Sequence, residues 1–483
     1  MRDLIQAAET GLARLQGPAQ YPPIEAAPYP PDEAYPEFPA LAVGRTPNPV
    51  FALVRNVLRD LGLDAARFGT PAWNPLGELV RPGGKIVVKP NWVLHRNEGA
   101  GGMDCMVSHP SLLRAILEYV FLARPAQVVL GDAPLQGCDF EKLQDYGGLR
   151  AVIAEFHGRG LALAVKDFRR TVMTVTNQLK QVAEDLRPES DYVLVDLGPD
   201  SLLEPISKDW KKFRVTVYDP RKMRAHHFPG RHRFLLARDI LEADLVVNVP
   251  KLKAHKKAGI TCCLKNLIGI NGNKEYLPHH RKGARQVGRG GDSHERGSWL
   301  LWALETALDG MNRRRDWPKF YRFCEYVVYG WLRVYRWKDP LAQLEGSWYG
   351  NDTIWRTCLD LNRALLYADK AGQMREVPQR EEISIVDAIV AGQGEGPLAP
   401  DPLETGAVFA ARNPAVGDRL GARLLGFDEA KIALLRHAGD EMRWRICAVA
   451  PQWPRFEPPF PAARPPKAWA GHLELPQGKT CRP

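Results

Sequence analysis

The chain has 483 residues, of which 45% are hydrophobic and 25% are charged, and its formal net charge is +10. This composition excludes a disordered or fibrous chain, and the length allows one large domain with insertions or two to three ordinary domains. The sequence has no apolar stretch of about 18 residues that could span a membrane and no apolar N-terminal region typical of a secretion signal, so we expect a cytoplasmic protein. The positive charge favours anionic partners of any kind.

Two proline-rich segments flank the expected folded part. Residues 18–39 contain eight prolines and no Lys or Arg, and residues 451–466 contain seven prolines. Such a proline density prevents helix and sheet, so the first segment is an extended arm that either wraps the body or stays mobile. The sequence divides into an N-terminal segment with its arm (1–44), an α/β core (45–298), a helical aromatic and basic insertion (299–375), the second part of the core (376–450) and a proline-rich tail (451–483).

Six short apolar runs predict buried strands. Runs that are apolar throughout, without alternation, are typical of strands covered on both faces, as in parallel sheets. Two segments between them, 109–123 and 148–160, have helical character, and Ser108 is a candidate cap of the first. The pattern predicts a doubly wound, mostly parallel α/β sheet. The runs are KIVVK (85–89), AQVVLGD (126–132), LALAV (161–165), YVLVDL (192–197), DLVVNV (244–249) and ISIVDAIV (383–390).

Polar residues follow or end most of these runs. In open α/β sheets, ligands bind at the carboxyl ends of the strands, near the point where the strand order reverses. We therefore expect the polar residues to converge on one crevice. They are Lys89, Asn91, Asp132, Asp196, Asn248, Lys251, Lys253 and Asp387.

The region from 299 to about 370 is rich in tryptophan and helical in character. Its segment 313–338 carries eight basic residues against two acidic ones, interleaved with aromatics. Three interpretations stay open: a packed helical insertion, a helix that contacts the inner face of the membrane peripherally, and a lid over a substrate.

Several stretches resemble a family catalogued as domain of unknown function 362 (DUF362). The most specific is PKLKxH…T…KNLxG within residues 243–269, and the resemblance implies an α/β fold with a probable site but no particular reaction. Some relatives carry a ferredoxin-like cysteine cluster, whereas the eight cysteines here include no C-x-x-C pair, which puts electron transfer in doubt. The other matching pieces are VVKPNWV (87–93), SHPSLLRAILEYV (108–120), VVLGDAP (128–134), SIVDAIVAGQGEGP (384–397) and AVFAARNPAVGD (407–418).

A basic cluster within this signature predicts an anion site. Ammonium groups supply charge, and the glycine-rich turn GINGN (269–273) lets backbone N–H groups approach a phosphate or carboxylate closely. The alternative is a solvated lysine face. The predicted substrate-binding residues are Lys89, Asn91, Lys251, Lys253, Lys265, Asn266, Lys274 and Glu395.

Histidines and carboxylates supply the candidate catalytic groups. We expect His255 or His279 to transfer protons, and Asp132 and Asp387 to act as base or cation ligands. Surface histidines and structural salt bridges are the alternatives. Asp418 is a candidate helix cap.

Metal and thiol chemistry remain alternatives. A divalent metal would take ligands from His279, His280 and Asp387, although their spacing matches no regular ligand pattern. Cys262 and Cys263 lie among lysines that would favour thiolates, but a buried neutral pair is the simpler interpretation.

These features favour an enzyme that binds an anionic small molecule or glycan precursor, with hydrolysis or group transfer as candidate reactions. The alternative is a non-enzymatic scaffold that binds anions, a membrane surface or RNA, although the sequence has no specific nucleic-acid motif. A redox protein is a second alternative, disfavoured by the missing cysteine cluster.

Overall fold

A computed structural model describes residues 4–176, 179–183, 187–215, 218–286, 290–297, 299–313, 323, 326, 345–450 and 460–475. Nearly all of the basic aromatic segment 313–338 lies outside the described residues, so its three interpretations stay predictions. No helix in the described ranges is long and apolar enough to cross a lipid bilayer.

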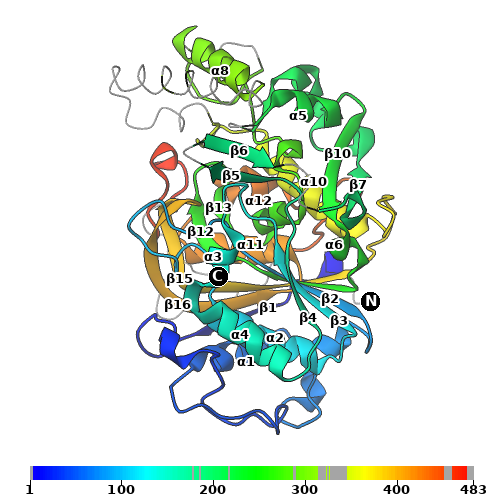
Figure 1. The fold of residues 1–483 in the computed structure, drawn as a ribbon, viewed down its shortest axis with the longest axis vertical. Helices are drawn as coiled ribbons and strands as arrows, with labels where there is room; N and C mark the ends of the chain where they lie inside the picture. The colour runs from blue at the N-terminus through cyan, green and yellow to red at the C-terminus, as the bar shows by residue number, and fades with distance from the viewer. Residues whose placement is uncertain are drawn as a thin grey trace.

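A mixed sheet of nine strands forms the centre of the described structure (Figure 1). Strands β15, β11, β2, β3 and β4 run parallel to one another, whereas β16 and β1 complete one side in antiparallel pairing. Five of the six apolar runs are strands of this sheet, which confirms the predicted α/β class. In order, the strands are β1 (Thr10–Arg14), β16 (Ala399–Ala411), β15 (Glu381–Glu395), β11 (Leu245–Val249), β2 (Lys85–Pro90), β3 (Gln127–Asp132) and β4 (Leu163–Asp167), with β12 (Lys251–His255) beside β15 and β13 (Gly259–Thr261) beside β12.

Helices cover both faces of this sheet (Figure 1). The central strands are therefore apolar on both sides: Ile86 and Val88 pack with the helices of one face, and Val87 packs with those of the other. One face carries α1 (Pro49–Asp60), α2 (Pro110–Leu122) and α4 (Leu149–Gly158); the other carries α6 (Arg238–Glu242), α7 (Cys263–Asn266), α10 (Ile354–Tyr367), α11 (Pro414–Leu424) and α12 (Ala433–His437).

The predicted helix at 109–123 is confirmed, but its cap is His109 and not Ser108. His109 has extended backbone angles, and its Nδ1 accepts a hydrogen bond from the N–H of Ser111. Proline at the next position fits the first helical turn, where no backbone donor is needed. The Ser108 hydroxyl instead donates to the carbonyl of Val249.

Smaller sheets and helices lie above the central sheet in Figure 1. The run 192–197 does form a strand, but it belongs to a separate antiparallel sheet; only one of its faces is buried, and Leu194 and Asp196 are exposed. Asp196 accepts from the backbone N–H of His232, so it does not join the predicted crevice. The elements are β7 (Tyr192–Asp196), β10 (Arg231–Ala237) and β9 (His227–Phe228), the pair β8 (Phe213–Arg214) and β14 (His280–Arg281), the pair β5 (Val172–Thr176) and β6 (Leu179–Ala183), and helices α3 (Phe140–Gln144), α5 (Pro220–His226) and α8 (Trp299–Asn312).

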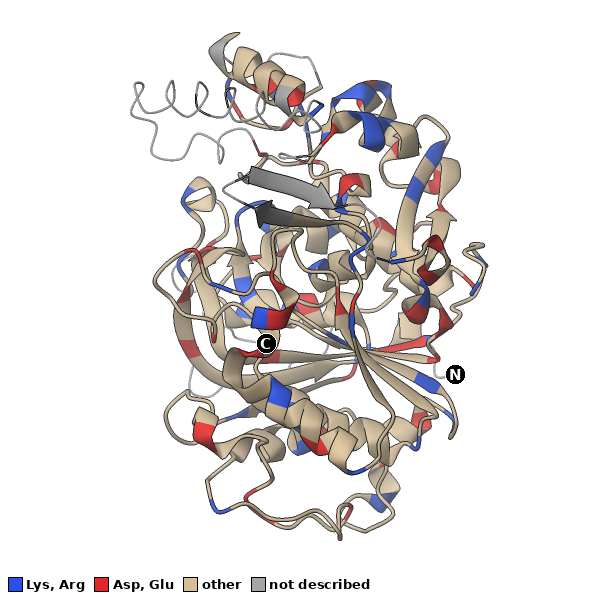
Figure 2. Cartoon of the chain, viewed as in Figure 1, with Lys and Arg blue, Asp and Glu red and all other residues tan. Residues whose placement is uncertain are grey.

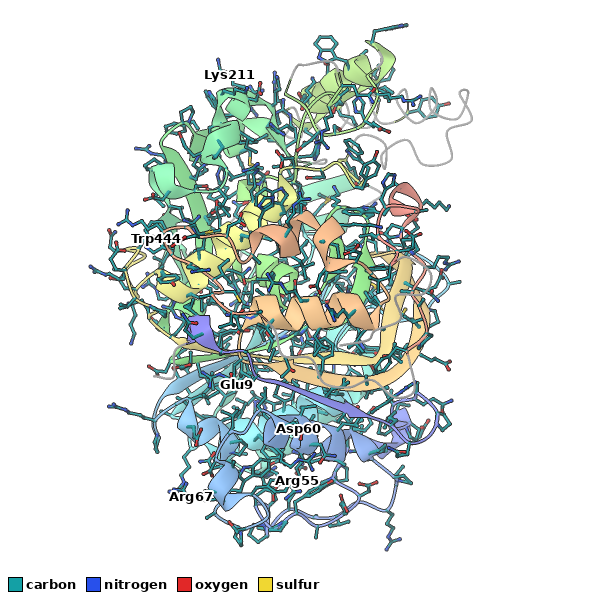
Figure 3. All side chains as sticks on the ribbon, turned by 180° about the vertical axis from the view of Figure 1, so that it is seen from behind. Glu9, Arg55, Asp60, Arg67, Lys211 and Trp444 are labelled. Carbon is teal, nitrogen blue, oxygen red and sulfur yellow. The ribbon has the colours of Figure 1, made fainter. Side chains whose placement is uncertain are left out.

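The proline-rich N-terminal arm wraps the body. Tyr29 and Tyr35 of the arm are buried, and Glu37 forms an ion pair with Arg55 of α1 at 2.7 Å. Figure 3 shows this side of the molecule, with Arg55 labelled on the lower layer. The segment 1–44 also contributes β1 to the central sheet, so it is integrated with the core.

Candidate functional site

A cavity of about 1050 Å³ lies beyond the carboxyl ends of β2, β3 and β4. The sheet has β3 on one side of β2 and β11 on the other, all in parallel pairing, so the order in which the strands are added to the sheet reverses at β2. Ligands of open α/β folds bind at such a point. Eight of the predicted site residues line the cavity: Lys89, Asn91, Asp132, His255, Lys265, Asn266, Lys274 and His279.

A buried ion pair forms the floor of this cavity. Lys89, the penultimate residue of β2, places Nζ 2.7 Å from Oδ1 of Asp132 at the end of β3. The other carboxylate oxygen of Asp132 accepts from the N–H of Trp92 at 2.7 Å. Gly269 packs against the pair, and a Cβ there would lie 2.6 Å from Lys89 Nζ. The parallel pairing of β2 and β3 thus fixes both partners.

A chain of side-chain amides connects the neighbouring strand ends. Oδ1 of Asn266 accepts from Lys89 Nζ at 3.1 Å and from Asn91 Nδ2 at 2.8 Å, and its Nδ2 donates to Asn248 at 2.8 Å. Lys253 donates to Oδ1 of Asn91 at 2.6 Å. The predicted residues Lys253 and Asn266 are therefore internal supports of the site, because buried networks of this kind hold each member in one orientation.

Three lysines surround the single carboxylate of Asp132. Lys89 already pairs with it, whereas the side-chain amines of Lys265 and Lys274 have no hydrogen bond or ion pair to any described residue. Burial lowers the pKa of both lysines, and that of Lys274 falls to about 7, with the cation of Lys89 contributing. The cavity wall consequently carries more positive than negative charge.

The two histidines of the cavity present opposite ring functions. Nδ1 of His255 accepts from the N–H groups of Lys257 and Ala258 at 3.0 and 3.2 Å, so the proton lies on Nε2. Nδ1 of His279 lies 2.6 Å from the carbonyl of Leu277, so this nitrogen donates and Nε2 keeps its lone pair. Burial and nearby lysines hold the pKa of both histidines well below the usual range. His255 is thus a donor and His279 an acceptor.

The wall and rim of the cavity are held by further ion pairs. Glu345 lies 3.2 Å from Lys257 Nζ and 3.6 Å from Lys256 Nζ. Arg169, after β4, pairs with Asp167 and donates to three backbone carbonyls of the loop 135–138. Each of these cations has an acidic partner, with Glu345 shared by two lysines, in contrast to Lys265 and Lys274.

Three predicted residues lie elsewhere. Asp387 is in the middle of β15 and not at a strand end; it pairs with Lys251 at 2.8 Å. Tyr21 of the N-terminal arm donates to Asp387 at 2.5 Å and accepts from Lys251 at 2.5 Å. Glu395 accepts from the N–H of Lys467 in the C-terminal tail. The arm and tail occupy these polar groups, so they do not face the cavity.

The predicted metal ligands do not converge. His279 lines the cavity, whereas His280 belongs to β14 outside the cavity lining and Asp387 is bound to Lys251. Elsewhere in the described part of the chain, the sulfur atoms of Cys262 and Cys263 and a carboxylate oxygen of Asp418 lie within 4.8 Å of one another.

Asp418 does not cap its own helix. That cap is Asn413, because α11 begins at Pro414. Asp418 instead accepts from the N–H of Leu264 at the start of α7. Burial raises the pKa of the Cys262 and Cys263 thiols, which agrees with the neutral interpretation of this pair.

A family model described as "Domain of unknown function (DUF362)" matches residues 205–423. These residues are similar to that family, as the sequence motifs predict. A crystal structure of a protein from Thermotoga maritima is similar over 67% of this chain, with 10% sequence identity and a TM-score of 0.30. The match covers 50% of that protein, so this chain spans about half its length. The curated proteins contain no match.

The range matched by the family model also contains a buried polar cavity residue that is absent from the predicted site. Thr261, at the end of β13, is buried and its hydroxyl has no partner in the described part of the chain. Gln136, in the loop after β3 and outside the matched range, likewise leaves both amide atoms unpaired. Both line the cavity. Both could have been found from the sequence. Gln136 lies in the loop just after the carboxyl end of the strand that Asp132 ends, and Thr261 is the threonine of the motif PKLKxH…T…KNLxG.

Proposed function

We propose that the protein is an enzyme that binds an anionic small molecule, carrying a phosphate or carboxylate group, in the cavity beyond β2 and β3. The supporting observation is the surplus of positive charge: Lys265 and Lys274 face the cavity without a partner among the described residues. Lys274 is buried and Lys265 is partly buried. Because buried charges are ordinarily paired, unpaired cations in such places favour an anionic ligand.

The neighbouring groups suit the rest of such a ligand. The hydroxyl of Thr261 and the amide of Gln136 are buried without a partner among the described residues, so both can form hydrogen bonds to a ligand. Buried polar groups ordinarily have such a partner. His255 offers a donor, and the lone pair of His279 can accept a proton during a reaction. The arrangement combines charge, hydrogen bonds and a proton acceptor in one cavity, which favours catalysis over simple binding.

The binding of a long polyanion has less support. Figure 2 shows Lys and Arg residues along α5, at the surface. Two of them already have acidic partners: Arg221 pairs with Asp219, and Lys222 pairs with Glu275. An exposed phosphate track would require unpaired surface cations.

Thermal unfolding with added anions tests the proposal. Inorganic pyrophosphate should raise the melting temperature of the full chain, and the variant Lys265→Met should lose most of that increase, because it removes one unpaired cation of the cavity. Lys370→Met is the matched control: it also removes one charge, from an exposed turn outside the cavity lining.

Sodium chloride at equal ionic strength separates a specific site from general screening. Stabilisation that chloride reproduces, or that Lys370→Met reduces as much as Lys265→Met does, would contradict an anion site in the cavity. Tight binding of RNA or anionic vesicles with a steep salt dependence would favour the scaffold alternative instead.

A further inference from the structure

Lys274 occupies an unusual position for a lysine. The residue is only 6% exposed, yet it lines the cavity and its amine has no hydrogen bond or ion pair to a described residue. Lys89 and Lys265 repel its charged form, and Asp132, the carboxylate that favours that form, is bound to Lys89. The neutral amine is therefore a substantial fraction of Lys274 near neutral pH.

The backbone around Lys274 is held firmly. Asn273 caps the short turn by accepting from the N–H of Glu275 at 2.9 Å. Glu275 pairs with Lys222 at 2.9 Å, so it supplies no counter-charge to the cavity. Asn271 accepts from the N–H of Leu235 on β10 at 2.8 Å. Such support keeps the amine directed at one place, as a reacting group requires.

We propose that Lys274 is a nucleophile that forms a Schiff base with the aldehyde or ketone group of an anionic substrate, whose anionic group lies beside Lys265. This inference rests on the proposed function, because the anion site would place the carbonyl near the amine. A desolvated lysine next to another cation is the usual arrangement of such nucleophiles. The substrate class is a small oxo acid or a phosphorylated aldehyde or ketone.

The step balances without any further reactant. The lone pair of Lys274 Nζ adds to the carbonyl carbon while the C=O π electrons move to oxygen. One amine proton passes to that oxygen to give a neutral carbinolamine, and His279, which lines the same cavity with Nε2 as an acceptor, would carry that proton. The hydroxyl then leaves as water with the second amine proton, and a C=N bond remains.

Reductive trapping tests this inference. The full chain is incubated at pH 7.5 with glyoxylate, an aldehyde that carries a carboxylate, and then with sodium cyanoborohydride. Peptide mass mapping should find the adduct predominantly on Lys274. Acetaldehyde, which lacks the anion, should need at least about tenfold higher concentration for the same labelling, because it lacks a charge-assisted contact.

Two variants sharpen the result. Lys274→Arg should remove the adduct while keeping a cation in the cavity, and Lys265→Met should abolish the preference for glyoxylate over acetaldehyde. Labelling spread over exposed lysines, without preference for Lys274, would overturn the inference. With that outcome, stabilisation of the wild type by pyrophosphate would mean that the Schiff base alone is wrong. If pyrophosphate has no effect on the wild type either, the proposed anion site fails as well.

Discussion

Gly269 lies directly against Asp132, so close that a Cβ atom on the glycine would overlap Oδ1 of the carboxylate. The two residues come from different parts of the chain, the turn after α7 and the end of β3. The carbonyl of Gly269 also accepts from the N–H of Ala133 at 2.9 Å. The absence of a side chain at 269 is thus a condition for the ion pair beneath the cavity.

Gly269→Ala should destabilise the protein by about 1–3 kcal/mol, because the added methyl group overpacks a closed site. It should also weaken pyrophosphate binding by displacing Lys89 and Asp132. Urea unfolding measures the first effect and calorimetric titration the second. Gly158→Ala is the control, since a Cβ at the end of α4 meets no atom within 4 Å. Equal stability of the two variants would show that position 269 tolerates a side chain.

Asp132→Asn should cost about 3–5 kcal/mol, because it leaves the charge of buried Lys89 without its partner. The double variant Lys89→Met/Asp132→Asn should recover much of that loss, since it removes the unpaired charge as well. Urea unfolding of wild type, both single variants and the double variant gives the coupling. Additive losses would mean that the two residues do not act as a pair.

Lys274→Met should stabilise the protein, by about 1 kcal/mol or more below pH 7. The pKa of Lys274 is about 7 in the folded protein and near 10.5 when exposed. The cost of burying this lysine is therefore greatest below pH 7 and disappears as pH rises towards 10.5. Unfolding free energies at pH 6, 8 and 9.5 should show the gain shrinking with pH; a gain that is constant with pH, as for Lys370→Met, would contradict this.

Glu382→Gln should give the opposite pH dependence. Burial raises the pKa of Glu382 to about 8, from 4.5 when exposed. The wild type therefore loses stability as pH rises from 4.5 to 8, whereas the glutamine variant does not. The two should be equally stable at pH 4.5 and differ most at pH 8 and above in urea unfolding. Exposed Glu404 is the control, and matching profiles for both variants would refute a buried neutral Glu382.

Tyr21→Phe should release the N-terminal arm. Its hydroxyl bridges Lys251 and Asp387, whereas the ring, stacked on His109 with centroids 3.9 Å apart, remains in phenylalanine. A hydrogen bond to charged groups contributes about 1.5–3 kcal/mol. Limited proteolysis of the arm should accelerate, while Ile24→Ala, at a 54% exposed arm position, should leave the rate unchanged. Unaltered proteolysis of the phenylalanine variant would mean that the bridge does not hold the arm.

The strands of the central sheet and the polar residues just after them were predictable from the sequence. Continuous apolar runs and the polar residues that end them are both local signals. Lys89, Asn91 and Asp132 came from these signals. The separate sheet of β7 was not predictable, since its place depends on pairing with β10. Long-range partners were also hidden: nothing near Asp387 in the sequence indicates that Tyr21, far along the chain, would bind it.

The histidine roles were equally out of reach of the sequence. Whether His255 donates and His279 accepts depends on backbone atoms that only the folded turn brings to each ring. The sequence could select the residues but not the position of their protons.

A crystal structure with selenate tests the central claim most directly, because the anomalous signal of selenium locates the anion. The account predicts a peak inside the cavity within hydrogen-bond distance of Lys265 Nζ, and its loss in crystals of Lys265→Met. A cavity without selenate, in crystals that bind it at surface lysines, would contradict the proposed anion site.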